Sequence, residues 1–303
     1  MSSGKLAYEP GEDSHYMSIP AFDEADFDAY CEAVDLYEQT WHTEPKEPQR
    51  SFLASRPKLK AELFQRALAG KRTFTPDVYK EDAGWEPERA LLQSNLLSSG
   101  LGSGTSPAGE NETVYFLIGL PGSGKSTALR PMVMEHSGLA AEAISVSDAD
   151  HLRSTFPEYA GGLGSGVVQD ECVELMYDRR LSRPERGLQG AILNAGGVTI
   201  VDVIGSPEHL PPLVRRLRRL KRRVYILQAS CETSTCVQRA KSRALTNGRF
   251  VPLEVILSKE GVPERTLEAV KASAKPTGWA VVDTNGLVPK IVDSAGFELL
   301  SVA

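Results

Sequence analysis

The segment Gly119–Thr127 has the composition and spacing of a phosphate-binding loop. It matches the pattern G-x-x-x-x-G-K-[S/T], with Gly119, Gly124, Lys125 and Ser126 at the fixed positions. Glycines let backbone N–H groups approach phosphate oxygens, and a lysine places positive charge beside the β- and γ-phosphates. A plain glycine-rich turn does not require Lys-Ser at those two positions. The segment therefore predicts a nucleoside-triphosphate site, in which the Ser126 hydroxyl coordinates Mg²⁺. The residues expected to contact ATP are Gly119, Gly122, Ser123, Gly124, Lys125, Ser126 and Thr127.

Two carboxylates, Asp148 and Asp150, follow the next apolar run of the chain. Phosphoryl transfer needs a base that orients and deprotonates the acceptor hydroxyl, and a carboxylate one strand away from the phosphate loop can do this. We therefore expect Asp150 to be that base. Both aspartates are also good helix N-caps, and the two roles are compatible.

A segment rich in arginine, Arg239–Pro252, is punctuated by Gly248 and ends at a proline. Guanidinium groups form paired hydrogen bonds with phosphate oxygens, and a loop that carries them can close over a phosphate site and exclude water. The alternative is the solvated end of a helix.

The elements that must position these residues begin after residue 110. Short apolar runs alternate there with longer amphipathic ones, which is typical of parallel strands joined by covering helices. The apolar runs are Val114–Ile118, Ala143–Val146, Val198–Val203, Val224–Leu227 and Trp279–Val282, and the helical patterns include Leu129–His136, Val168–Tyr177 and Glu185–Asn194. We therefore expect an α/β domain with a doubly wound, mostly parallel sheet over residues 111–303. Ligands of such sheets bind beyond the carboxyl ends of the strands, where the segments above fall.

The first third of the chain has a different character. Residues 1–97 are predicted to form a small, acidic, helical region, with helices over 23–39, around Leu59–Ala67 and over 87–97. Residues 1–49 contain twelve carboxylates and two lysines, which we interpret as a solvated segment. The stretch 98–110 is rich in serine and glycine and is expected to be a flexible linker.

Composition excludes several classes of protein. The net charge of −6 provides no overall basic field, which argues against a nucleic-acid ligand. No apolar run is long enough to span a membrane, and the N-terminus lacks the pattern of a signal peptide. We expect a cytoplasmic protein, with export by a route that reads no such peptide left open. The basic cluster Arg215–Arg223 is interpreted as the exposed face of a covering helix, with a nucleic-acid or phosphate-rich acceptor as the alternative.

The four cysteines show no spacing typical of a metal site, and free thiols suit a reducing compartment. Cys231 and Cys236 flank an expected strand-to-helix turn and are predicted to be buried, small apolar residues.

Other classes of phosphate-loop protein fit less well. Asp202–Gly205 resembles the DxxG motif of GTPases, but no guanine-reading NKxD sequence follows, and Asp283–Gly286 lacks the lysine. A remodelling ATPase would show an apolar run ending in Asp-Glu, which this chain does not have. A kinase is the class that the motifs favour.

The loop G-x-P-G-S-G-K-S after one strand, the sequence D-x-D-x-L-R at 148–153 after the next, and Pro157-x-Tyr159 resemble the zeta-toxin family of P-loop kinases over roughly residues 111–290. The resemblance implies a kinase fold, ATP as the phosphoryl donor with Mg²⁺, and a nucleotide-like small molecule as acceptor. The best-known acceptor in the family is UDP-N-acetylglucosamine, phosphorylated at the 3′-hydroxyl of the sugar, and one relative, a type III effector of a plant pathogen, phosphorylates NAD. The resemblance also makes an antitoxin or chaperone-like protein partner an expectation.

The family's functional residues transfer unevenly to this chain. Lys125 and Ser126 match the phosphate loop, Asp150 matches the catalytic base, and Arg243 and Arg249 match two lid arginines that hold the ATP phosphates. Arg239 competes with Arg243 for the first of these positions. The residues expected on the acceptor side are Asp148, Phe156, Glu185 and Asp202.

Three departures from the family pattern concern the acceptor more than the reaction. Phe156–Pro157 replaces a frequent His-Pro, Asp202 stands where the family has a glutamate, and Ile204–Pro207 lacks the threonine and arginine that help to hold the nucleotide sugar. Glu185 is only an approximate match, and Phe156 has the alternative of a core residue. The expected function is transfer of phosphate from ATP to a hydroxyl of a molecule such as a UDP-N-acetyl-sugar or NAD. The alternatives are a kinase of nucleic-acid ends or of another metabolite, and a nucleotide-binding interaction module with little turnover.

Overall fold

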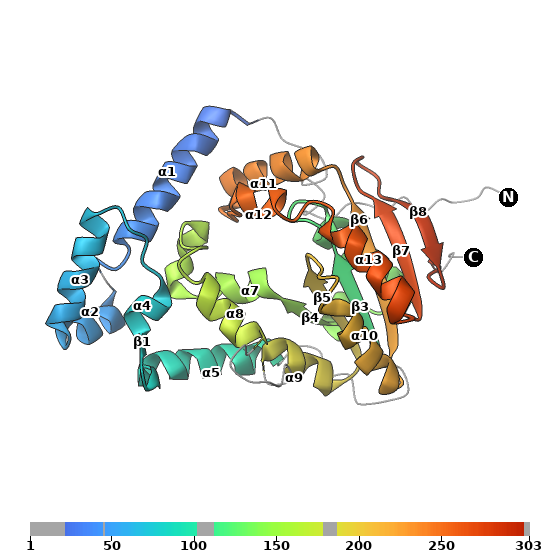
Figure 1. Ribbon diagram of the computed structural model, residues 1–303, viewed down its shortest axis with the longest axis horizontal. Coiled ribbons are helices and arrows are strands. Elements are labelled where there is room, and N and C mark those ends of the chain that lie inside the picture. Colours follow the sequence, from blue (N-terminus) through green and yellow to red (C-terminus); the bar gives the residue numbers. More distant parts are fainter. Residues whose placement is uncertain (1–21, 45, 102–111, 178–186, 300–303) are drawn as a thin grey trace.

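The computed structural model of the chain describes residues 22–44, 46–101, 112–177 and 187–299. Its centre is a sheet of six strands in the order β4-β5-β3-β6-β7-β8 (Figure 1). Five strands are parallel, and the last pairs antiparallel at one edge. The strands are β3 (Thr113–Ile118), β4 (Ser145–Asp148), β5 (Val198–Val203), β6 (Arg223–Ser230), β7 (Gly278–Asp283) and β8 (Lys290–Ala295). The predicted α/β class with a mostly parallel sheet is confirmed, and the antiparallel edge strand β8 was not predicted.

Helices cover both faces of the sheet. As a result, every residue of the central strand β3 is buried, whichever face its side chain points to. Tyr115 and Leu117 face a cluster that includes Leu129 and Val133, whereas Val114 and Phe116 face the opposite cluster. The covering elements are η2 (Lys125–Leu129), α6 (Arg130–Ser137), η3 (Ala141–Ala143), α7 (Ala149–Ser154), η4 (Pro157–Gly162), α8 (Gln169–Tyr177), α9 (Leu188–Ala195), α10 (Leu210–Arg219), α11 (Thr233–Asn247), α12 (Leu253–Leu257) and α13 (Val262–Ser273).

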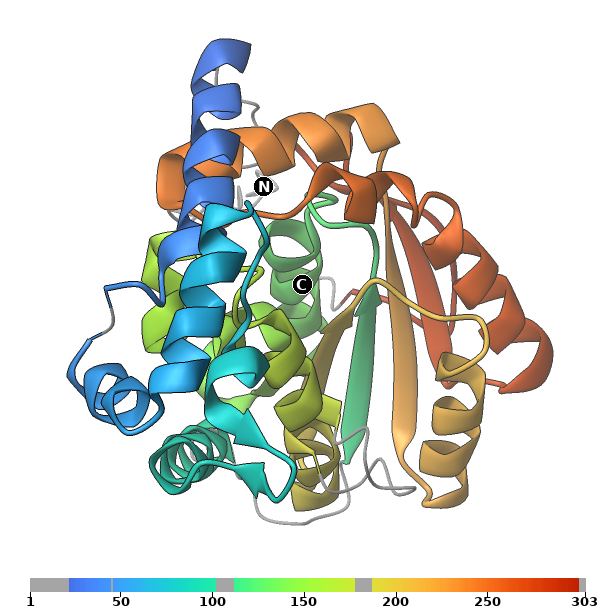
Figure 2. The same cartoon turned by 60° about the vertical axis from the view of Figure 1, so that its left-hand side comes forward.

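The N-terminal helices pack along one side of this body (Figure 2). They are α1 (Glu24–Thr40), α2 (Glu47–Ala54), α3 (Pro57–Leu68), α4 (Thr75–Tyr79) and α5 (Pro87–Leu101), with a short hairpin of β1 (Lys80–Glu81) and β2 (Gly84–Trp85) before α5. Trp41 and Leu63 share one apolar cluster with Phe156, Val168 and Met176 of the body. The N-terminal helices therefore complete a core rather than stand apart from the sheet.

Three helices predicted in this region are present, as α1, α3 and α5, whereas α2, α4 and the hairpin were not predicted. Helix α5 continues to Leu101, four residues into the expected linker, and residues 102–111 lie outside the described residues. Within the described ranges, none of the helices has the length and hydropathy needed to cross a lipid bilayer.

Candidate active site

The phosphate loop connects the end of β3 to η2, a single π-helical turn that leads into α6. Gly122 and Gly124 have φ angles of 81° and 87°, in the left-handed region that favours glycine. A Cβ atom at Gly122 would also lie 2.3 Å from the carbonyl oxygen of Cys236. Both positions therefore favour glycine for backbone conformation, as the motif implies for Gly124, and Gly122 also requires it for close packing.

Lys125 lies over the loop, at the carboxyl end of the neighbouring strand β5. Its Nζ atom donates hydrogen bonds to the carbonyl oxygens of Gly119, at 2.8 Å, and Leu120, at 3.1 Å. The same atom is 3.6 Å from Oδ1 of Asp202. The ammonium group is thus held where the loop, the helix N-terminus and β5 meet, which is the position that a lysine of this motif needs in order to neutralise phosphate charge.

Asp148 and Asp202 end two adjacent strands and are register partners in the pair β4 and β5. Arg130, the first residue of α6, donates from Nη2 to Oδ2 of Asp148 at 2.6 Å and to Oδ2 of Asp202 at 3.3 Å. Burial raises the pKa of Asp202, and the charges of Lys125 and Arg130 oppose that rise. Asp148 also accepts a hydrogen bond from the backbone N–H of Asp150, so it caps α7 as the N-cap interpretation predicted.

Arg130 was not predicted from the sequence. It lies four residues after Ser126, one helical turn further along, so the side chains of these two residues share a face. That spacing is the signal that could have identified it.

Asp150 lies between two guanidinium groups that reach it from different segments. Arg249 donates from Nε to Oδ2 at 3.1 Å and also from Nη2, and Arg153 forms an ion pair with Oδ1 at 3.0 Å. Burial would raise the pKa of Asp150, but the positive charges of Arg249 and Arg153 outweigh it and hold the pKa well below the ordinary value. The carboxylate is therefore ionised and can accept a hydrogen bond from a hydroxyl group.

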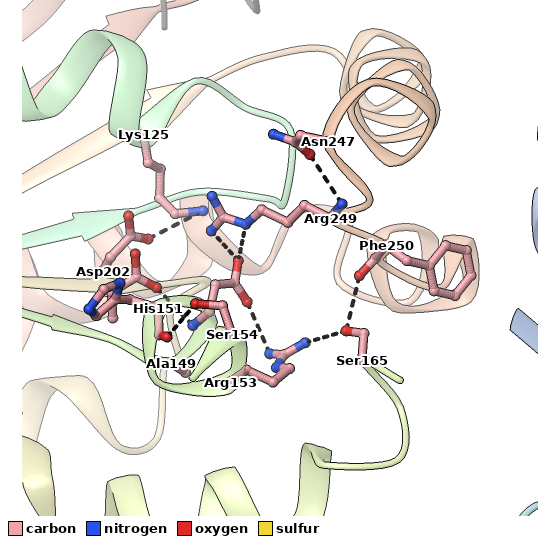
Figure 3. A network of polar contacts seen from close by, with 12 residues as sticks. Lys125, Ala149, His151, Arg153, Ser154, Ser165, Asp202, Asn247, Arg249 and Phe250 are labelled. Carbon is pink, nitrogen blue, oxygen red and sulfur yellow. Dashed lines mark hydrogen bonds and ion pairs between the residues drawn. The ribbon is translucent and has the colours of Figure 1, made fainter. Parts of the chain in front are cut away.

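Arg153 connects this carboxylate to the segment after α11. Its Nη1 atom donates to Oγ of Ser165 at 3.1 Å, and that hydroxyl donates to the carbonyl oxygen of Phe250 at 3.2 Å (Figure 3). Arg153 is the last residue of the D-x-D-x-L-R motif, and no role was predicted for it. Its position three residues after Asp150 on α7 places both side chains on one face, which is a usable signal.

The arginine-rich segment is part helix and part loop. Arg243 lies in α11, Gly248 caps the helix with a φ angle of 72°, and Arg249 follows in the loop. The positive charge of Arg243 also lowers the pKa of Asp150. The structure therefore brings both predicted lid arginines to the predicted base. Arg239, the competing assignment, is buried and instead contacts Cys231 and the carbonyl oxygen of Asn285.

Charge at this site favours an anionic ligand. The site contains more cationic side chains than carboxylates. Each of these cations contacts a carboxylate of the site or lies close enough to shift its pKa. They are Lys125, Arg130, Arg153, Arg243 and Arg249, and the carboxylates are Asp148, Asp150 and Asp202. A surplus of positive charge beside a phosphate loop suits a triphosphate.

Phe156, one of the residues expected on the acceptor side, is buried and does not line the site. The Phe156 side chain is only 2% exposed, and the guanidinium carbon of Arg89 lies 5.2 Å from its ring centroid. Phe156 therefore belongs to the core, which was the alternative interpretation, and its buried ring is not available to stack on a ligand. Glu185 lies outside the described residues.

The basic cluster lies at the other end of the sheet. Arg218 donates to the carbonyl oxygen of Arg222 at 2.9 Å and to Oγ1 of Thr277 at 2.8 Å, and Arg222 is buried. Strand β6 begins at Arg223, so this cluster is at the amino ends of the strands, opposite the carboxyl ends that carry the site. The arrangement fits the covering-helix interpretation.

Comparison with known proteins agrees with this geometry. The family model described as zeta toxin matches residues 100–289, more than half of the chain. The solved complex of AvrRxo1-ORF1 and AvrRxo1-ORF2 with ATP has a TM-score of 0.53 and 15% sequence identity, over 76% of this chain and 80% of that chain. The PezAT toxin-antitoxin system of Streptococcus pneumoniae has a TM-score of 0.46 and 14% identity, over 73% of this chain and 85% of that chain. None of the curated proteins compared with the chain matches it. Because the family model covers more than half of the chain and the phosphate loop lies within the matched residues, the chain belongs to the zeta-toxin family of ATP-dependent kinases.

Proposed function

We propose that this kinase transfers the γ-phosphoryl group of ATP to a hydroxyl of a nucleotide-like small molecule, such as a UDP-N-acetyl-sugar or NAD. One observation carries the proposal: Asp150 is within ion-pair distance of Arg249, and its charge acts on Asp202, which lies 3.6 Å from Lys125 of the phosphate loop. A carboxylate base and a phosphate-binding cation are thereby adjacent where an acceptor hydroxyl would meet the γ-phosphate.

The proposed sequence of events uses Arg249 as a shared partner. In the structure Arg249 pairs with Asp150, which keeps the pKa of that carboxyl low. A γ-phosphate on the loop competes for the same guanidinium, because phosphate oxygens accept its paired hydrogen bonds. As Arg249 turns to the phosphate, the pKa of Asp150 rises and the carboxylate becomes a better base.

The γ-phosphoryl group is then transferred to the acceptor. Asp150 accepts the proton of the acceptor hydroxyl while that oxygen forms a bond to the γ-phosphorus. The bond from the γ-phosphorus to the β–γ bridging oxygen breaks, and ADP leaves. Lys125, Arg243 and Arg249 stabilise the charge on the transferred group and on the leaving oxygen.

Mg²⁺ fits the oxygen ligands present. The Ser126 hydroxyl and the carboxylates of Asp148 and Asp202 would hold it, since they are hard oxygen donors at adjoining strand and helix ends. When bound, the ion would neutralise charge on the β- and γ-phosphates. Among the described residues no group of three or more His, Cys, Asp or Glu side chains could hold a metal ion. Oxygen atoms of ATP would supply the other ligands of Mg²⁺.

A neutralising protein partner is part of the same proposal. The relative AvrRxo1-ORF1 was solved together with AvrRxo1-ORF2, and PezAT is described as a toxin-antitoxin system. Co-purification of the chain with the product of an adjacent reading frame would test this.

The test is a mass-spectrometric acceptor screen with Mg·ATP, UDP-sugars, NAD and a metabolite extract. We expect one product heavier by a phosphate, and Asp150→Asn should lower kcat about 10²–10⁴-fold while ATP binding is retained. Asp170→Asn, which alters an exposed carboxylate of α8, is the matched control and should behave as wild type. Near-normal turnover of Asp150→Asn would remove Asp150 from the role of base. Absence of any product, with ATP binding intact, would favour an interaction module.

A further inference from the structure

Two cysteines face each other at the start of α11. Glu232 is the N-cap of this helix, so Cys231 precedes the cap and Cys236 is the fourth residue of the helix. Side chains at these two positions pack together in the motif called a hydrophobic staple. Both belong to the apolar cluster around Leu120. The two side chains are close enough that a hydrogen bond between them shifts the pKa of both thiols. The helix start therefore holds two free thiol groups in contact.

Cys231 is partly accessible and contacts one guanidinium group, while the cavity beside it is also lined by Glu232, Glu260 and Glu264. The residue is half-buried and lines a cavity of about 560 Å³, which Leu120 and Ser123 of the phosphate loop also line. Nη1 of Arg239 lies 3.5 Å from its Sγ atom. Both cysteines were predicted to be buried, small apolar residues. This is correct for Cys236 and wrong for Cys231, because the strand-to-helix turn opens onto the cavity.

These contacts favour the thiolate form of Cys231. The hydrogen bond from Cys236 lowers the pKa of Cys231 to about 7, the charge of Arg239 adds to this effect, and burial and the carboxylate of Asp283 oppose it. The other cysteines differ in direction. Burial, with Asp28 and Asp35, raises the pKa of Cys31, and burial raises the pKa of Cys172 to about 12. The hydrogen bond to Cys231, together with burial, raises the pKa of Cys236, so Cys236 keeps its proton while Cys231 is reduced. A thiolate, rather than a thiol, is the nucleophile in cysteine chemistry.

We propose that Cys231 is a modification site for peroxides and other soft electrophiles, and that Cys236 captures the oxidised form as a disulfide beside the phosphate loop. The Cys231 thiolate attacks one oxygen of hydrogen peroxide, the O–O bond breaks, and a sulfenic acid and hydroxide form. The Cys236 sulfur then attacks the Cys231 sulfur, the S–O bond breaks, and the hydroxyl leaves as water with the proton of Cys236. The two thiols together supply the two electrons that reduce the peroxide.

The disulfide would act directly on the phosphate loop. The backbone of Gly122 packs so closely on Cys236 that a Cβ atom at Gly122 would lie 2.3 Å from the Cys236 carbonyl oxygen. Thr284 also ties the loop to β6, because its Oγ1 lies 2.7 Å from the carbonyl oxygen of Ser123 and 3.1 Å from that of Ser230. A shift of Cys236 toward Cys231 therefore changes the packing under the loop, and we expect ATP affinity to fall about tenfold.

The first experiment measures thiol reactivity and requires neither ATP nor an acceptor, so its outcome is independent of the proposed function. The full-length protein is treated with limiting iodoacetamide at pH 7, and the rate at each cysteine is read by mass spectrometry. Cys231 should be alkylated about tenfold faster than Cys31, the half-buried cysteine of α1 that serves as the internal control. Equal or slower labelling of Cys231 would overturn the proposal.

The second experiment uses hydrogen peroxide followed by alkylation, digestion and mass spectrometry. We expect a Cys231–Cys236 cross-linked peptide that disappears with dithiothreitol. The peptide should be absent from Cys231→Ser and Cys236→Ser and present in Cys31→Ser, with circular dichroism confirming that each variant is folded. ATP affinity should fall in the wild type, recover on reduction, and resist peroxide in Cys231→Ser. Labelled Cys231 without a cross-link would overturn the role of Cys236, and a cross-link without loss of affinity would overturn the link to the loop.

Discussion

The phosphate loop and the junction between Asp150 and Arg249 lie on the same edge of the sheet but are built in different ways. The loop makes most of its hydrogen bonds locally, since Lys125 bonds to carbonyl groups five and six residues away and Thr127 bonds to Gly124, although Thr284 also bonds to Ser123. At the junction, the two bonded residues are 99 positions apart in the chain. One half of the candidate site therefore depends on local sequence, and the other half depends on how distant segments pack.

The N-terminal helices contribute to the second half. Tyr30 of α1 donates from its hydroxyl to the carbonyl oxygen of Gly248 at 2.9 Å, across 218 positions of the chain, and its ring packs on Phe250 with centroids 6.0 Å apart. Lys241 of α11 pairs with Glu24. Helix α1 lies against α11 in both views of the molecule (Figures 1 and 2). The segment that presents Arg249 thus rests on a helix from the other end of the chain.

The largest expected effect comes from removing the buried ion cluster that joins α5 to the body. Arg89 bonds to both Glu158 and Glu171 at distances between 2.7 and 3.1 Å, and all three residues are buried. Arg89→Met leaves two buried carboxylates without their cation, so the free energy of unfolding should fall by about 3–5 kcal/mol. Denaturant unfolding measures this. The control Arg50→Met removes an exposed pair and should change stability by less than about 1 kcal/mol, and equal effects would show that the cluster does not hold the two parts together.

Lys125→Ala tests the local half of the site. We expect kcat/KM for ATP to fall about 10²–10³-fold, because a cation directed at the transferring charge is lost. The unfolding midpoint should stay close to wild type, since the loop glycines remain. Isothermal titration with ATP and steady-state kinetics measure the two effects. Lys259→Ala, at an exposed position of the same chain, is the control, and unchanged binding in Lys125→Ala would refute the phosphate-loop assignment.

Two adjacent glycines allow a matched test of the assembled half. A Cβ atom at Gly162 would lie 1.3 Å from the carbonyl oxygen of Gly248, whereas a Cβ atom at Gly161 has nothing within 4 Å. Gly162→Ala should displace the segment that carries Arg249 and lower kcat by about 10²-fold, because a misplacement of about 1 Å has that effect on a positioned group. Gly161→Ala places alanine in a left-handed backbone conformation but creates no close contact. This variant should lose about 1 kcal/mol of stability and keep a near-normal kcat. Similar kcat values for the two variants would contradict the packing role of Gly162.

The smallest expected effect belongs to Tyr30→Phe, which deletes one hydrogen bond to Gly248. A partly buried neutral hydrogen bond contributes about 0.5–1.5 kcal/mol, so kcat should fall by a factor of about 2–10 as the Arg249 segment loosens. Tyr37→Phe removes a comparable bond from the same helix to the carbonyl oxygen of Glu158. That variant should lose similar stability and keep its kcat. A kcat loss of the same size in both would mean that α1 stabilises the fold without positioning Arg249.

Pattern alone identified much of this molecule. The five parallel strands, the phosphate loop with Lys125, and Asp150 at a strand end were predicted because each depends on short-range signals: apolar runs, obligatory glycines and carboxylates at strand ends. Arg243 and Arg249 were assigned through the resemblance to the zeta-toxin family. The edge strand β8 was missed because its residues are largely exposed and show no apolar run.

Other assignments needed the tertiary structure. The sequence was compatible with Phe156 in a ligand pocket or in the core. The structure places it in the core because the N-terminal helices pack over it. Arg130 and Arg153 acquired roles from neighbours that come from other strands, helices or loops. The sequence by itself determined the phosphate loop and the strands, because steric rules and hydrophobic periodicity act over a few residues. The tertiary structure alone decided which charges meet Asp150 and which thiol is accessible, because burial and electrostatic contact depend on segments that folding brings together.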